Sequence, residues 1–131
     1  MFAIEVHAVF CAAHALRLDS GETEATHGHN FDVTVKLTAQ RLDRMQTVVD
    51  FHDVERLLLQ VLAPWTNQNL NLLEPFRARV NPSAERIAEQ IGVQLQGLLT
   101  TLPDAPVVTR GLRVIEVRVT EAPDCAAIWM P

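Results

Sequence analysis

The stretch Phe2-Ala3-Ile4-Glu5-Val6-His7-Ala8-Val9-Phe10-Cys11-Ala12 decides the fold class, because every second residue of it is apolar and β-favouring. A period of two with such side chains is typical of a strand that buries one face. Residues 30–38 repeat the pattern, with Phe31, Val33, Val35 and Leu37 on one side. We therefore predict two strands, at 2–12 and 30–38, that pair antiparallel and are joined by a functional loop.

Two helices are predicted between residues 50 and 99. Asp50 is a fitting N-cap for a helix over residues 51–62, whose apolar residues follow the spacing of one helical face, and Pro64 ends it. The second helix opens with Asn81 as its cap and Pro82 in its first turn, and its apolar stripe reaches Leu99.

Two further strands complete the pattern. Residues 112–120 alternate again, and residues 126–129 follow after a turn that contains Pro123. The order ββααββ predicts an α+β domain, a four-stranded antiparallel sheet with two helices packed on one face. Four strands leave two open edges, so we expect a homo-oligomer that assembles through its sheet edges.

Length and composition exclude several classes of protein. A chain of 131 residues with 48% hydrophobic and 21% charged residues fits one domain over residues 1–131. A net charge of -5 without a basic stripe argues against nucleic acid as a partner. No apolar run reaches the roughly 18–20 residues of a membrane span, and the first residues lack the features of a secretory leader. We therefore expect a cytoplasmic protein without a membrane partner, with Cys11 and Cys125 as free thiols.

Three of the five histidines surround the loop between the first two strands. His14 follows the first strand, and His27 and His29 precede the second. Residues two apart in an extended segment point to the same side, and antiparallel pairing brings His14 close to the other two. Three converging imidazoles are typical of a catalytic zinc site with an open fourth position. Ordinary polar loop residues are the alternative, and spacing alone does not separate the two; His7 and His52 fit that ordinary role.

Five segments stand in order along the chain: 10–16 (FCAAHAL), 27–31 (HGHNF), 49–51 (VDF), 81–85 (NPSAE) and 120–123 (TEAP). Each is weak alone, but all five in register over nearly the whole chain are specific. Together they resemble the 6-pyruvoyl-tetrahydropterin synthase and 6-carboxy-tetrahydropterin synthase (QueD) family. The resemblance implies the tunnelling fold, in which an antiparallel sheet with two helices assembles through its edges into barrels.

The resemblance also implies a metal, a substrate and site residues. It assigns Zn²⁺ to His14, His27 and His29, and it implies 7,8-dihydroneopterin triphosphate as the substrate. The metal then binds side-chain hydroxyls of this pterin while triphosphate is eliminated or the side chain is cleaved. Glu121 takes the place of the glutamate that anchors the pterin ring, because a carboxylate offers paired acceptors to paired donors. A solvated charge at a strand end is the alternative for Glu121.

The chain departs from the family pattern at three positions. Thr23 stands where members usually carry a cysteine that acts as a base, and Thr66 and Asn67 stand where an Asp-His pair is expected. None of these side chains can move a proton at neutral pH as the family's groups would. Cys11 and Cys125 are too distant in sequence to replace the cysteine.

Glu24 offers a substitute for the cysteine. The pattern Glu-x-x-His-Gly-His at 24–29 resembles a subgroup in which glutamate takes over and the product is 6-hydroxymethyl-7,8-dihydropterin for folate synthesis. A carboxylate beside a zinc-bound hydroxyl is a reasonable base if partial burial raises its pKa. Glu22 is the nearby competitor for this role.

Two functions follow as expectations. The first is a zinc-dependent lyase of pterin metabolism, in which the absent cysteine argues against the carboxy-tetrahydropterin reaction of queuosine synthesis and Glu24 favours the hydroxymethyl branch. The second is a non-catalytic or repurposed homologue that binds zinc and a pterin or purine. Retention of the three histidines and Glu121 predicts ligand binding in either case. A neighbouring subunit that supplies the missing acid-base group is a further hypothesis.

Overall fold

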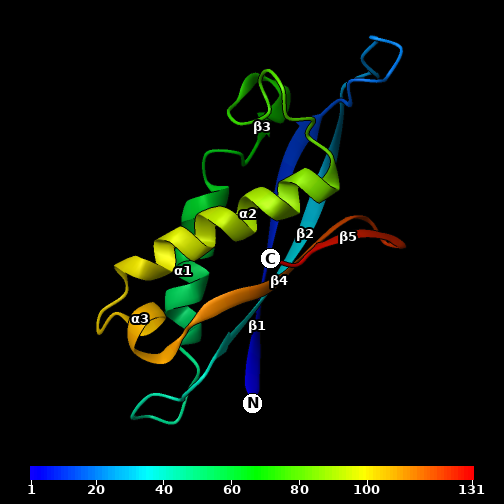
Figure 1. Ribbon diagram of the computed structural model, residues 1–131. Coiled ribbons are helices and arrows are strands. Elements are labelled where there is room, and N and C mark those ends of the chain that lie inside the picture. The colour runs from blue at the N-terminus through cyan, green and yellow to red at the C-terminus, as the bar shows by residue number, and fades with distance from the viewer.

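The computed structural model describes residues 1–131, and a five-stranded sheet in the order β3-β1-β2-β4-β5 lies at its centre. Four strands pair antiparallel in the order β1, β2, β4, β5: β1 (Phe2–His14), β2 (His27–Ala39), β4 (Arg113–Ala122) and β5 (Cys125–Trp129). Figure 1 shows α1 (Phe51–Leu62) and α2 (Ala84–Leu98) lying on the same side of the sheet. No helix combines the length and the apolar character that a membrane crossing requires.

The expected α+β class is confirmed, but the four-stranded antiparallel ββααββ arrangement is not. The additional strand is β3 (Gln68–Asn69), which runs parallel to β1 beside Ala12 and Ala13. Two residues are too few to give a periodic signal in the sequence. A third helix, α3 (Pro106–Arg110), and the short 3-10 helices η1 (Leu70–Leu72) and η2 (Leu99–Thr101) also escaped prediction, because each is about one turn long.

β1 and β2 pair along their whole length, from Phe2 opposite Ala39 to His14 opposite His27. On the helix side Val6 and Phe10 of β1 and the apolar residues from Phe31 to Leu37 of β2 are buried, and Phe10 stacks on Phe31 with ring centroids 5.1 Å apart. Both strands extend beyond their predicted ends. His27 and His29 consequently lie inside β2 rather than in the loop before it.

In both long helices a polar side chain at the N-cap accepts a hydrogen bond from a backbone N–H of the first turn, but only the N-cap of α1 is the residue that we predicted. Asp50 accepts a hydrogen bond from the backbone N–H of His52, as expected. Asn81 was predicted to cap α2, and that prediction is wrong, because Ser83 accepts from the N–H of Arg86 in its place. The Asn81 side chain is already engaged with the backbone of Arg17, to which it both donates and accepts.

A close approach holds α2 against β5. The ring of Trp129 lies where a side chain on Gly92 would project, so only a glycine leaves room for the indole at this point. Gly97, about one and a half turns further along the same helix, has open space where a side chain would begin, with no neighbouring atom within 4 Å. The two glycines of α2 therefore have different roles, although the sequence treats them alike.

The sheet has two incompletely paired edges. β3 covers β1 only at Ala12 and Ala13, so the outer edge of β1 over residues 2–11 pairs with no other strand. β5 forms the opposite edge of the sheet. Exposed apolar side chains accompany both edges, Phe2 and Val9 on β1 and Ile128 on β5.

Candidate metal centre

The sheet register brings the three predicted histidines together. His14 and His27 are direct partners across β1 and β2, and His29, two residues along β2, is opposite Ala12. Alternation along the strand therefore places all three on one face. The ring centroids lie 4.7 Å apart for His14 and His27, 5.1 Å for His14 and His29, and 4.9 Å for His27 and His29.

Hydrogen bonds to backbone carbonyls fix two of the imidazoles. His14 is 1% exposed, and its Nδ1 lies 2.7 Å from the carbonyl oxygen of Pro82. His27 Nδ1 lies 2.9 Å from the carbonyl oxygen of Ala25. A carbonyl oxygen only accepts, so each Nδ1 carries the proton and donates. In their neutral forms both rings therefore present a lone pair at Nε2, the tautomer that a metal ligand needs.

Glu121 joins the three histidines. Its Oε1 lies 2.8 Å from Nε2 of His14 and 3.4 Å from Nε2 of His29. The pairing of β4 with β5 shifts register between Thr120 and Ala122, so Glu121 is the additional residue of a β-bulge. A bulge re-aims the side chain it carries. One ligand atom from each of these four residues lies within 4.8 Å of the other three.

The donor set fits a bound metal ion. Nε2 of His14 and Nε2 of His29 are buried and make no hydrogen bond. Lone pairs from two nitrogens and a carboxylate oxygen thus face one another, an arrangement that a cation stabilises. Ligands about 2.0–2.1 Å from a tetrahedral zinc ion are roughly 3.3 Å apart, close to the separation of His29 and Glu121. Nitrogen and oxygen donors suit zinc and other divalent transition metals alike.

The protonation state of His29 favours metal binding. Burial lowers the pKa of its imidazole from 6.5, and this effect outweighs the opposing attraction of the Glu121 carboxylate. A lowered pKa keeps the ring neutral at physiological pH. Neutral imidazole is the form that binds a metal.

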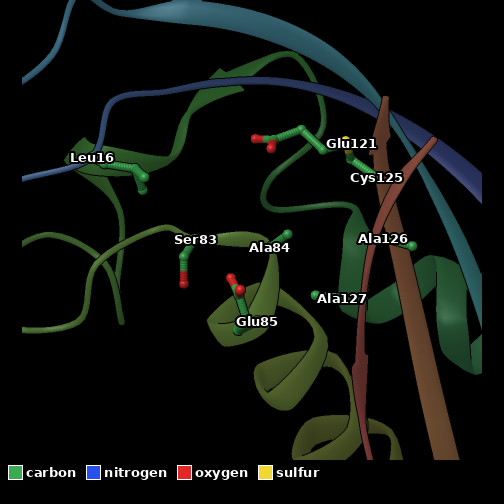
Figure 2. Close-up of a pocket in the computed structure, with 8 residues that line it drawn as sticks. All are labelled: Leu16, Ser83, Ala84, Glu85, Glu121, Cys125, Ala126 and Ala127. Carbon is green, nitrogen blue, oxygen red and sulfur yellow. The ribbon is translucent and has the colours of Figure 1, made fainter. Parts of the chain in front are cut away.

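A cavity of about 280 Å³ lies next to this cluster. Glu121 belongs to both, and Figure 2 shows its carboxylate reaching from β4 toward Leu16, above a hollow that Ser83 and Glu85 line from the opposite side. Cys125 and Ala126 form the wall on the β5 side. The volume is near the lower end of the range for small-molecule sites, and its polar groups are few.

Glu24 lies at the rim of the cluster. Its Oε1 accepts a hydrogen bond of 2.9 Å from the backbone N–H of Leu16 and is 3.9 Å from Nε2 of His27. The Glu24 N–H donates in turn to the carbonyl of Leu16, so the residue is anchored at two points. Glu22, the competitor in the sequence, is exposed and forms no ion pair with a histidine.

Side chains from the 3-10 helix η1 and from two loops clamp the segment that follows His14. Asn71 accepts from the N–H of Ala15 and donates to its carbonyl, at 2.8 and 2.7 Å. Asn81 does the same for Arg17, at 2.9 and 3.0 Å. Glu24 holds Leu16 between them. These contacts were not predicted, because asparagine is read from sequence as a turn or cap residue.

The remaining residues singled out in the sequence lie outside the cluster of His14, His27, His29 and Glu121. His7 pairs with Asp32, and His52 contacts its own helix cap Asp50; both imidazoles are exposed. Cys11 and Cys125 are free thiols, as expected, and exposed. Thr66 donates to the carbonyl of Leu62, and Asn67 turns the chain with a φ of 59°.

Comparison with known proteins places the chain in a family. The family model for 6-pyruvoyl tetrahydropterin synthase matches residues 3–131. Among solved structures, the Caenorhabditis elegans 6-pyruvoyl tetrahydropterin synthase superposes with a TM-score of 0.76 at 21% identity, over 99% of this chain and 95% of that one. The Plasmodium vivax enzyme gives 0.72 at 18% identity, over 100% and 99%. No curated protein sequence matches significantly.

The chain therefore belongs to the 6-pyruvoyl tetrahydropterin synthase family, as its motifs had indicated. Its fold is that of the family's tunnelling-fold members. A variant of the Plasmodium vivax synthase in which alanine replaces a catalytic glutamate is also similar, with a TM-score of 0.72 at 19% identity over 100% of this chain and 99% of that one.

Proposed function

We propose that the protein is a zinc-dependent lyase that acts on 7,8-dihydroneopterin triphosphate, with His14, His27 and His29 as zinc ligands. The observation that carries this proposal is that the ring nitrogens of three histidines converge beside a cavity of small-molecule size. When bound, Zn²⁺ supplies Lewis acidity that lowers the proton affinity of a substrate hydroxyl. The family of the chain supports the pterin as the substrate class.

Glu24 is the base in this proposal. The Leu16 N–H holds one of its oxygens, and its carboxylate faces His27 from the rim. A carboxylate held beside a metal ligand in this way can accept a proton from a hydroxyl that binds at the metal. A catalytic glutamate in the similar Plasmodium vivax synthase supports the assignment. It also favours 6-hydroxymethyl-7,8-dihydropterin as the product over the carboxy product.

Glu121 and the cavity bind the pterin. The carboxylate of Glu121 lies at the cavity wall, where it can accept from the paired N–H donors of a pterin ring. Ser83 and Glu85 provide further polar groups in the same wall. The dimensions of the cavity suit a bicyclic ring better than the whole triphosphate, which then extends toward solvent.

A non-catalytic pterin or purine binder is the second candidate. Thr66 and Asn67, which replace the expected acid-base pair, have structural roles: one caps a carbonyl group at the end of α1 and the other forms a turn. At the cluster this chain by itself therefore offers two carboxylates, Glu24 and Glu121, and no Asp-His pair. A protein without turnover would still keep the metal and the pocket.

A mass-spectrometric assay separates the two candidates. The zinc-loaded protein is incubated with 7,8-dihydroneopterin triphosphate, alongside Glu24→Ala, His27→Ala and, as the matched control, Glu22→Ala. A lyase converts the substrate to a new pterin, loses this activity in the first two variants and keeps it in the third. Tight binding with no new pterin in the unaltered protein would reject the lyase and support the binder.

A further inference from the structure

Glu121 makes contacts that a residue with the sole role of anchoring a pterin ring would not need. A carboxylate that only received a pterin would face the cavity, yet Oε1 contacts Nε2 of both His14 and His29. No other acidic residue lining the cavity belongs to the metal cluster: Glu85 lines the cavity too, but it is outside the group of four ligand atoms.

We propose that Glu121 is a fourth metal ligand in the ligand-free protein, and that a ligand entering the cavity must draw this carboxylate away. The inference rests on the metal site of the proposed function but not on turnover. In this view the metal site of the ligand-free protein has four protein ligands, rather than three histidines and an open fourth position.

Hydrogen-bond geometry argues against a simple ion pair between Glu121 and His14. The two atoms are 2.8 Å apart, but Nε2 of His14 makes no hydrogen bond, so the oxygen is displaced from the axis along which a ring N–H would donate. The same holds for His29 at 3.4 Å. An oxygen that lies beside two nitrogen axes rather than on either is placed as a neighbouring ligand around a common ion.

The bulge of β4 explains how one carboxylate serves both places. Glu121 is inserted between two paired residues, so its side chain emerges where the cluster and the cavity meet. It is about one-third exposed, which leaves it room to move, whereas His14 is buried and fixed by Pro82. A partly exposed carboxylate beside a buried, fixed imidazole is the arrangement expected of a group that exchanges between metal and cavity.

Metal affinity without substrate tests the inference directly. Zn²⁺ binding is measured by competition with a chromophoric chelator for the unaltered protein, Glu121→Gln and Glu85→Gln. We expect Glu121→Gln to lower the affinity by at least the roughly 10–100-fold seen when outer-shell partners of a metal are lost, and Glu85→Gln to leave it unchanged. Equal losses in both variants would mean that only nearby negative charge matters and would overturn the proposal, as would no loss in either.

Cobalt substitution adds a readout of coordination. The visible spectrum of the Co²⁺-loaded protein should change in Glu121→Gln and in Glu121→Asp, whose shorter side chain keeps the charge but withdraws the oxygen. An unchanged spectrum in both folded variants would exclude Glu121 as a ligand. The melting temperatures of the metal-free proteins show that each variant is folded.

The displacement step has its own measurement. Adding 7,8-dihydroneopterin triphosphate to the Co²⁺-loaded protein should shift the spectrum toward that of Glu121→Gln. Binding of the pterin with no spectral shift would overturn the displacement. Absence of binding would instead reject the proposed substrate, while the metal titration would still decide whether Glu121 is a ligand.

Discussion

Burial divides the histidines of the cluster into two kinds. His14 is 1% exposed and donates to Pro82, whereas His27 is 42% exposed. We predict that His27→Ala lowers zinc affinity by about 100-fold or more without changing the melting temperature of the metal-free protein. His14→Ala should lose the metal and also about 1–3 kcal/mol of stability, because it leaves a buried carbonyl without its donor.

Metal titration and thermal unfolding of the metal-free variants test this difference. His7→Ala is the control, because His7 lies on the exposed sheet face and pairs only with Asp32. If His7→Ala lowered the metal affinity as much as His27→Ala does, the ion would have to bind outside the cluster.

At the level of residues, the sequence indicated the three histidines, Glu121 and Glu24; the histidines and Glu121 lie together, and Glu24 lies 3.9 Å from His27 at the rim. The spacing His-Gly-His predicted that both imidazoles share a face, because side chains alternate along a strand. The contact of Glu121 with the imidazoles could not be predicted from the sequence. It depends on a bulge, which shifts a register by one residue and leaves no pattern in the residues around it.

Helix α2 offers a matched pair of glycines. Gly92→Ala should destabilise the protein by about 1–3 kcal/mol, because the new methyl group meets the ring of Trp129. Gly97→Ala should stabilise it by about 0.4–1 kcal/mol, since that position is open and helical. Chemical denaturation gives both values, and tryptophan emission should shift to longer wavelength only for Gly92→Ala. Equal effects of the two changes would show that Trp129 does not limit this contact.

The N-cap of α1 depends on pH in a predictable direction. The backbone N–H of His52, followed by its side chain, lowers the pKa of Asp50 from 3.8. Because the pKa of Asp50 is lower in the folded state than in the unfolded state, its ionised carboxylate stabilises the fold at pH values above the unfolded-state pKa. This stabilisation is lost as the pH falls through the folded-state pKa. We expect Asp50→Ala to lower the melting temperature at pH 7, whereas Asp50→Asn retains the cap and nearly the original value.

Melting temperatures measured from pH 7 down to pH 2 check this expectation. The advantage of the unaltered protein over Asp50→Ala should shrink below about pH 4, while the difference between Asp50→Asn and Asp50→Ala stays constant. A gap between the unaltered protein and Asp50→Ala that did not depend on pH would contradict the assigned cause.

The clamp on residues 15–17 should influence the metal from a distance. Asn71 bonds both backbone groups of Ala15, the residue next to His14. We predict that Asn71→Ala lowers zinc affinity about tenfold by loosening His14, as loss of an outer-shell partner does. Asn71→Asp keeps the oxygen that accepts from the N–H of Ala15 and should lower zinc affinity less. The cobalt spectrum measures the effect, and an unchanged spectrum and affinity in folded Asn71→Ala would assign the clamp to stability alone.

Long periodic elements were predictable for the whole molecule, and short or context-dependent ones were not. The bounds of α1 matched, and β1, β2 and β4 were located because each carries a sustained apolar period; β5 was located as the short segment after the turn at Pro123. β3 forms only because the chain after α1 returns beside β1, a tertiary event. Asn81 was misread as a cap for the same reason: its partner, Arg17, is distant in sequence.

The two sheet edges predict self-association of the whole molecule. The β1 edge over residues 2–11 and the β5 edge carry exposed apolar groups, among them Val9 and Ile128. We expect a mass in solution that is a multiple of 14.6 kDa, and a shift toward the single-chain mass in Ile128→Lys. Light scattering after size exclusion decides this. A single-chain mass for the unaltered protein would contradict assembly through the edges.

The position of Glu121 in the next-to-last strand, β4, also has a consequence for how the protein is made. Translation delivers His14, His27 and His29 early, then the Pro82 carbonyl that orients His14, and only much later the strand that carries Glu121. The three histidines therefore leave the ribosome before their carboxylate partner does. If Glu121 is a metal ligand, as proposed above, the set of four ligands is complete only when the last strands of the sheet have been made, and an incomplete chain offers an ion the three histidines alone.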